Sequence, residues 1–213
     1  MIQYDGMDKF KEECGVFGIF AQDSLPVEEI TFYGLFALQH RGQDSAGIAV
    51  SDGKNIKYHK DKGLVPEVFD GNTLARLKGG KIAIGHVYYS TTGEVHLYDA
   101  QPLVIKYKKG TIALANNGQL INAEQFREEL ENEGAVFQTS TDSEVVANLI
   151  ARQGEKDLET SVKNAVERLR GSFALVIMTE DKLIAIRDPN GMRPLALGKL
   201  DNSYVVASES CAF

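Results

Sequence analysis

Cys14 is the first residue of the chain whose side chain could carry out covalent chemistry. It lies between a charged segment, residues 1–13, and the apolar run of residues 16–20. A thiolate is a strong nucleophile, but a free thiol has a pKa of about 8.5 and needs a base. Cleavage after Glu13 would free the Cys14 α-amino group, whose pKa of about 7.7–8.0 suits it to accept that proton. The alternative is a buried structural cysteine.

The dipeptide Asn117-Gly118 follows an apolar run and allows two interpretations. Asn-Gly is typical of a tight turn, so a purely structural role is one of them. The other is an oxyanion hole, in which the Asn117 side-chain amide and the Gly118 N–H stabilise the oxyanion of an attacked amide. Loss of one such donor typically lowers a rate by about 10²–10³.

Three more polar residues could belong to a site. Asp142 lies in the first turn of an expected helix, where it either compensates the helix dipole or binds a substrate ammonium group. Arg41 follows another expected helix, and capping of that helix is its alternative role. His86 has no His or Cys at metal-ligand spacing, so we expect no metal site.

The composition excludes several classes of protein. The chain has 213 residues, 43% of them hydrophobic, with a net charge of −7 and a pI near 5.2. We therefore expect no binding to nucleic acid or to a membrane surface. Two cysteines without an apolar signal segment argue against a disulfide framework. These features predict a cytoplasmic protein.

The elements that position these residues are mostly short strands. Helices are expected over 26–42, over 122–134, from 141 onward and over 158–169, with capping boxes at Asn122 and Thr141. In the first helix, residues 27, 30, 33, 37 and 38 form the expected apolar stripe. Strands are expected at 16–20, 47–50, 56–58, 81–89, 103–107, 111–115, 173–179, 183–186, 195–197 and 204–207. Hairpins outnumber strand–helix–strand crossovers, which favours an α+β fold with antiparallel sheets.

Several separated motifs together resemble one known family. They are CGVFGIF, LQHRGQDSAGIAV, GHVYYST, NNGQLINA, TSTDSEV, RDPNGMRPLALGK and VVASES, from about residue 12 to the end. Their order and spacing are similar to the glutaminase half of the glutamine phosphoribosylpyrophosphate amidotransferases. The resemblance implies an N-terminal-nucleophile hydrolase fold, a four-layer αββα sandwich of two mainly antiparallel sheets. It divides the chain into a leader, 1–13, and a glutaminase domain, 14–213, without the phosphoribosyltransferase domain.

The resemblance also implies a reaction and its residues. Cys14 would attack the glutamine side-chain amide, release ammonia and leave a thioester for water to hydrolyse. Asn117 and Gly118 match the oxyanion hole, and Asp142 matches the carboxylate that binds the glutamine α-amino group. Arg41 matches an arginine close to the nucleophile, and we count it with the substrate-binding residues.

Two positions depart from the family pattern. The family has GHVR, whose arginine binds the glutamine α-carboxylate, and this chain has Tyr88 there. The family has HNG, and this chain has Asn116 in place of the histidine. These changes support an alternative function, a glutaminase-like binding or regulatory module that is non-catalytic or altered in specificity.

The expected partners follow from the resemblance. They are glutamine and a phosphoribosyltransferase domain or subunit that receives the ammonia, in the first committed step of purine biosynthesis. No cofactor is expected in this chain, because an iron–sulfur cluster would need cysteines from outside it. The sequence leaves open whether the chain forms a homo-oligomer.

Overall fold

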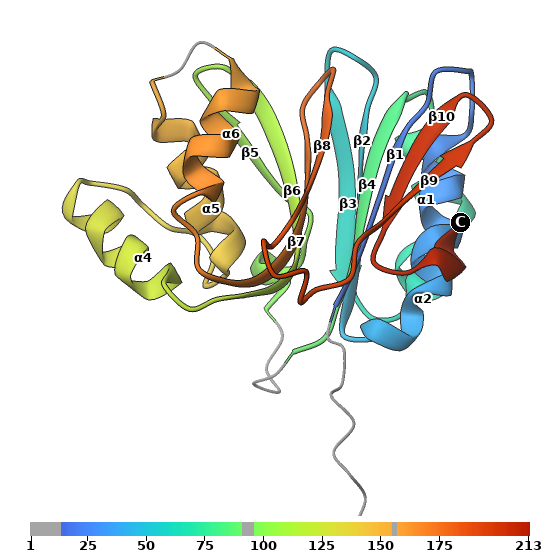
Figure 1. Ribbon diagram of the computed structural model, residues 1–213. Helices are drawn as coiled ribbons and strands as arrows, with labels where there is room; N and C mark the ends of the chain where they lie inside the picture. The colour runs from blue at the N-terminus through green and yellow to red at the C-terminus, as the bar shows by residue number, and fades with distance from the viewer. Residues whose placement is uncertain (1–13, 91–95, 155–156) are drawn as a thin grey trace, which may run out of the picture.

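The computed structural model describes residues 14–90, 96–154 and 157–213. Two antiparallel sheets pack face to face, and each carries helices on its outer face (Figure 1). This is the predicted α+β sandwich with four layers, helix, sheet, sheet and helix. The predicted leader, residues 1–13, lies outside the described residues.

The larger sheet has six strands in the order β3-β2-β4-β1-β10-β9. Its first strand, β1, lies at the interior of the sheet, between β4 and the late strand β10. The strands are β1 Gly15–Phe20, β2 Ser45–Ser51, β3 Ile56–Lys62, β4 Ile82–Tyr88, β9 Ala196–Leu200 and β10 Ser203–Ala207.

The smaller sheet has four strands in the order β5-β6-β7-β8. They are β5 Leu103–Tyr107, β6 Gly110–Leu120, β7 Gly171–Met178 and β8 Leu183–Arg187. β6 is longer than the expected strand 111–115 and runs through Asn117-Gly118, which pair with β7. The turn interpretation of this dipeptide is therefore wrong.

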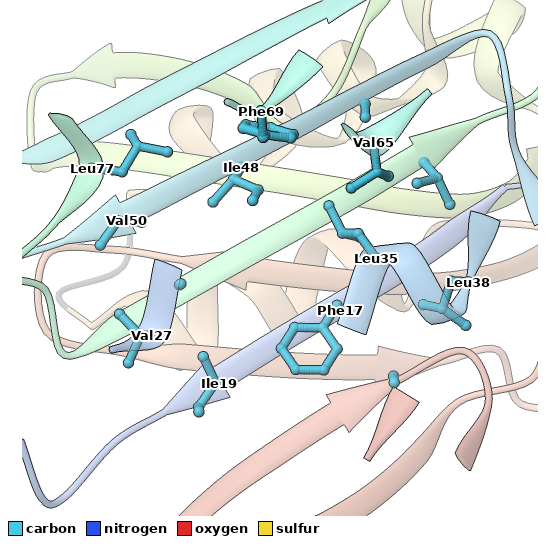
Figure 2. Close-up of a cluster of buried hydrophobic side chains, with 14 of the residues drawn as sticks. Phe17, Ile19, Val27, Leu35, Leu38, Ile48, Val50, Val65, Phe69 and Leu77 are labelled. Carbon is cyan, nitrogen blue, oxygen red and sulfur yellow. The ribbon is translucent and has the colours of Figure 1, made fainter. Parts of the chain in front are cut away.

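Helices α1 Val27–Ala37, α2 Val65–Val68 and α3 Gly71–Leu77 cover the six-stranded sheet. Figure 2 shows the core beneath them, where Phe17 of β1 lies near Leu35 of α1 and Ile19 of β1 lies near Val27. Gly34 lets α1 approach closely, because a Cβ there would lie 2.5 Å from the Phe17 ring. The helix therefore turns Gly34 and Leu35 inward and leaves Tyr33, part of the expected stripe, 67% exposed.

Helices α4 Ala123–Asn132, α5 Asp142–Arg152 and α6 Leu158–Val166 cover the four-stranded sheet. The two expected capping boxes do not form, since neither Asn122 nor Thr141 makes a side-chain cap hydrogen bond. The Asn122 side chain bonds Arg168 and Arg170 instead. Glu144 accepts from the backbone N–H groups ahead of α5.

The two sheets meet over an apolar layer that becomes polar at one end. Val16, Ala115 and Val176 belong to the apolar part. At the polar end, β1 begins while β4 and β6 finish, and the register Gly15↔Val87 places the first two ends side by side. His86 Nε2 of β4 joins the sheets there by a 3.0 Å hydrogen bond to the Asn116 carbonyl of β6.

The longest helices in the described ranges have 11 residues, too few to cross a membrane. The cytoplasmic location expected from the sequence stays a prediction.

Short 3₁₀ turns complete the elements: Gln39–Arg41, Leu97–Asp99 and Ser210–Ala212. The first directly follows α1 and brings Arg41 to the start of β1.

Candidate active site

A cavity of about 240 Å³ opens at the polar end of the sandwich. Its walls come from both sheets, from the start of α5 and from the loop between β8 and β9. Cys14, Tyr88, Asn116, Gly118, Asp142 and Arg193 are among its lining residues. Residues predicted from separate motifs therefore meet at one place.

Cys14 lies immediately before β1 and is only 8% exposed. Its φ angle is +67°, in the left-handed region that non-glycine residues rarely adopt. Such a conformation costs about 1–2 kcal/mol. The Sγ atom lies 3.9 Å from the Tyr89 carbonyl. Cys14 is thus both buried and strained, and it faces the cavity.

Arg41 fixes the backbone of Cys14 from both sides. Its carbonyl accepts the Cys14 N–H at 3.0 Å, and its Nε donates to the Cys14 carbonyl at 2.8 Å. The guanidinium is buried and pairs with Glu209 at 2.5 Å. Burial alone would raise the Glu209 pKa, but hydrogen bonds from Arg41 and His40 outweigh it, and the pKa is lowered. Arg41 contacts Cys14 and is not among the residues that line the cavity, so its predicted contact with substrate stays a prediction.

Asn117 is fully buried in β6. Side chains alternate along a strand, so Asn117 shares a face with Ala113 and Ala115, both in the layer between the sheets. Val16 of β1 contributes to the same layer, two residues after Cys14. The register thus places the Asn117 amide on the face that Cys14 also approaches.

Gly118 requires the absence of a side chain. Its φ is +142°, and a Cβ would lie 2.0 Å from the Ser172 carbonyl oxygen. Only glycine allows β6 to approach β7 this closely while its backbone faces the cavity.

Asn116, the other departure from the family pattern, is held by its backbone. Its N–H donates to Gln101 Oε1 at 2.8 Å, and its carbonyl accepts from His86 Nε2. Since a carbonyl only accepts, the hydrogen of neutral His86 is on Nε2. Burial lowers the His86 pKa to about 4. The Asn116 Oδ1 atom is buried without a hydrogen-bond partner within the described residues.

Asp142 begins α5, as expected, and also faces the cavity. Its carboxylate accepts the Leu120 N–H at 2.7 Å, which ties the end of β6 to the helix. Burial raises the Asp142 pKa, against opposing contributions from the Leu120 N–H and from Arg127. A bound cation would restore the ionised form.

Tyr88 ends β4 and lines the cavity, half-buried. Burial raises the pKa of Tyr88, and electrostatic interactions with Cys14, Asp99 and Asp44 raise it further. The phenol therefore remains neutral, and it can donate one hydrogen bond but carries no positive charge.

Several lining residues were not predicted as site residues, and Arg193 and Gln101 are two of them. Arg193 comes from the motif RDPNGMRPLALGK, which the sequence indicated as a turn and as part of the family resemblance but not as a source of site residues. Gln101 accepts both the Asn116 N–H and the Ser143 hydroxyl, at 2.8 and 2.9 Å. Neither contact has a local sequence signal, because each joins residues far apart in the chain.

No cluster of three or more His, Cys, Asp or Glu side chains that could hold a metal occurs among residues 14–90, 96–154 and 157–213. The expectation of no cofactor stays a prediction.

Comparison of this sequence with models of known protein families identifies the class of protein to which the fold and the cavity belong. A family model described as "Glutamine amidotransferase domain" matches residues 94–213, more than half of the chain. The chain therefore belongs to the glutamine amidotransferase domain family.

Two relatives that match this chain share one name, amidophosphoribosyltransferase. The chain is 50% identical to the amidophosphoribosyltransferase of Bacillus subtilis over 203 residues, 95% of this chain and 42% of the relative. It is also 50% identical to that of Methanocaldococcus jannaschii over 201 residues, 93% of this chain and 42% of the relative. The chain thus spans less than half the length of these relatives.

Solved structures agree with these matches. The glutamine phosphoribosylpyrophosphate amidotransferase from B. subtilis, complexed with ADP and GMP, superimposes with a TM-score of 0.87 at 48% identity, over 94% of this chain and 43% of that one. A glutamine amidotransferase class-II domain protein from Silicibacter pomeroyi shares the fold, with a TM-score of 0.56 at 16% identity, over 90% of this chain and 87% of that one. The predicted sandwich is confirmed.

Proposed function

We propose that this chain hydrolyses glutamine through a Cys14 thioester and supplies the ammonia to a phosphoribosyltransferase part outside it. The observation that carries the proposal is the cavity lined by Cys14, Gly118 and Asp142. The relatives support a phosphoribosyltransferase part as the acceptor of the ammonia. They are named amidophosphoribosyltransferases, and this chain covers only 42% of the length of each. Such an enzyme would begin purine biosynthesis.

The first step requires a base for the Cys14 thiol. Removal of residues 1–13 would supply it as the free α-amine of Cys14 itself. The strained φ of Cys14 supports this removal. The angle φ is defined by the carbonyl carbon of the preceding residue, so cleavage of the peptide bond before Cys14 would relieve this strain. The amine nitrogen would keep the Arg41 carbonyl as an acceptor, which orients its lone pair.

The Cys14 thiolate would then attack the side-chain amide of glutamine. The thiolate sulfur adds to the glutamine amide carbon, and the carbonyl oxygen becomes an oxyanion. The Asn117 amide and the Gly118 N–H would donate hydrogen bonds to that oxyanion. The C–N bond breaks as the α-ammonium of Cys14 returns its proton to the nitrogen, and ammonia leaves. Water cleaves the thioester to glutamate and regenerates the thiol.

Asp142 would anchor the substrate through the glutamine α-ammonium group. Asp142→Asn keeps an oxygen for the Leu120 N–H but removes the charge. A hydrogen bond between charged groups contributes about 1.5–3 kcal/mol, so we expect KM to rise by about 10- to 150-fold. Steady-state kinetics would measure this, and an unchanged KM would contradict the assignment.

The decisive test is glutamate release by protein that begins at Cys14, with its N-terminus verified by intact mass. Cys14→Ala should abolish the release. The matched control is Cys211→Ala, since Cys211 is an exposed free cysteine outside the cavity. Equal release by the Cys14 variant and the parent would refute the hydrolase. Full activity in protein that still begins at Met1 would refute the α-amine as base.

A second candidate, a glutamine-binding or regulatory module without turnover, is favoured by Tyr88 at the family's arginine position and by Asn116 at its histidine position. Tyr88→Arg tests it. If glutamine turnover appears only after this change, the module is the native function. If the parent already turns over glutamine with an ordinary KM that the change does not improve, the module is excluded.

A further inference from the structure

The loop between β8 and β9 is built around the carboxylate of Asp188, which is 3% exposed. This carboxylate accepts the backbone N–H groups of Asn190, Met192 and Arg193 at 3.0, 3.1 and 3.0 Å. Burial alone would raise the Asp188 pKa, but these hydrogen bonds outweigh it, and the pKa is lowered. The carboxylate thus stays ionised and holds the loop.

The preceding residue fastens the same loop from its other side. Arg187 donates from Nε to the Arg193 carbonyl and from Nη2 to the Gly191 carbonyl, each at 2.7 Å. Gly191 has a φ of +62°, a conformation that suits glycine at a tight bend. Hydrogen bonds on both sides fix the backbone at Arg193, which is one of the residues that line the cavity.

The charges of the cavity wall match an amino acid. Within the described residues that line it, Asp142 is the one carboxylate and Arg193 the one cation. A free α-amino acid carries an ammonium and a carboxylate on the same carbon. A wall with one group of each sign suits this zwitterion, while a wall with Asp142 and neutral Tyr88 would leave the carboxylate without a charged partner.

We propose that Arg193 binds the α-carboxylate of glutamine and thereby replaces the cation that Tyr88 does not supply. This inference rests on the proposed function for the identity of the substrate. Arg193 is a substrate-binding residue that acts on ground-state affinity, so its loss raises KM more than it lowers kcat. The expected loss of affinity is about 10- to 150-fold.

The enzyme-side test uses Arg193→Gln, Arg193→Lys and the matched control Arg152→Gln. Arg152 is an arginine at the far end of α5 that pairs with Glu133 outside the cavity. KM for glutamine should rise about 10- to 150-fold in Arg193→Gln, recover in part in Arg193→Lys and stay unchanged in the control. Equal KM values in Arg193→Gln and the parent would overturn the proposal.

A binding measurement separates this inference from the hydrolysis. Calorimetry would record the affinity of L-glutamine and of L-glutaminamide, which lacks the α-carboxylate, for Cys14→Ala protein freed of residues 1–13. Protein with Arg193 should bind glutamine about 10- to 150-fold more tightly than glutaminamide, and Arg193→Gln should remove that preference. Equal weakening of both ligands indicates a structural role and overturns the proposal.

The outcomes distinguish the two claims. If the parent does not hydrolyse glutamine but the preference depends on Arg193, the hydrolase fails and the inference stands. If hydrolysis is normal and the preference survives in Arg193→Gln, the inference fails and the hydrolase stands. If glutamine does not bind at all, both fail.

Discussion

His86 should make the stability of this protein depend on pH in a range where few other groups titrate. The residue is completely buried and donates its one hydrogen to the Asn116 carbonyl, so a second proton on Nδ1 would be buried without a hydrogen-bond partner. Burial, and to a smaller extent the charge of Lys60, lower its pKa from 6.5 to about 4, while the Asn116 carbonyl opposes this shift.

The sign and size follow from proton linkage. A histidine with a lowered pKa binds its proton more weakly when folded, so the unfolded chain takes up more protons and stability falls as the pH drops below 6.5. With folded and unfolded pKa values of about 4 and 6.5, the loss between pH 7 and pH 4.5 is about 2.5 kcal/mol.

The assay is denaturant unfolding at pH 7, 6, 5 and 4.5 for the parent and for His86→Gln. Glutamine can still donate to the Asn116 carbonyl but does not titrate. Contributions from carboxyl groups, including the raised pKa of Asp142, occur in both proteins and cancel in the difference. The parent should lose about 2.5 kcal/mol more than the variant. Parallel stability curves would refute the buried neutral histidine.

Two further predictions test the packing around Gly118, in the proposed oxyanion hole, and the ion pair of Arg41 beside Cys14. Gly118→Ala should reduce stability by about 3 kcal/mol or more, because the added Cβ would meet the Ser172 carbonyl. The control Gly53→Ala, at φ +89° with open space around it, should cost only about 1 kcal/mol. Thermal unfolding that shows equal losses for the two variants would contradict this packing. Glu209→Gln should lower stability by about 1 kcal/mol, because buried Arg41 loses its charged partner at a carboxylate that is 35% exposed; an unchanged denaturant midpoint would show that this ion pair is dispensable.

Most strands were predictable because they contain a short apolar run with a turn signal at its end, as β1 and β7 do. The conformation or burial of residues that depends on contacts distant in the sequence could not be predicted in this way. Asn117-Gly118 has the composition of a turn, yet β7 extends the sheet through it. The stripe of α1 was misplaced at Tyr33 because close packing of Gly34 on Phe17 decides which face is buried.

The site was predictable only in part, for the same reason. Cys14, Gly118 and Asp142 carry local signals and do meet at the cavity. Arg193 lies in a motif of the family resemblance, but its residue type and spacing alone did not assign it to the site. Thr141 was assigned a capping box on spacing alone, but Glu144 is engaged by the residues that precede the helix.

The position of β1 between β4 and β10 has a consequence for synthesis on the ribosome. The strand that follows the nucleophile is made first, yet one of its two neighbours ends at Ala207. Complete pairing of β1 must therefore wait until nearly the whole of these 213 residues has been translated. A nascent chain therefore cannot complete the strand that follows Cys14, or fix the surroundings of this residue, early in its synthesis.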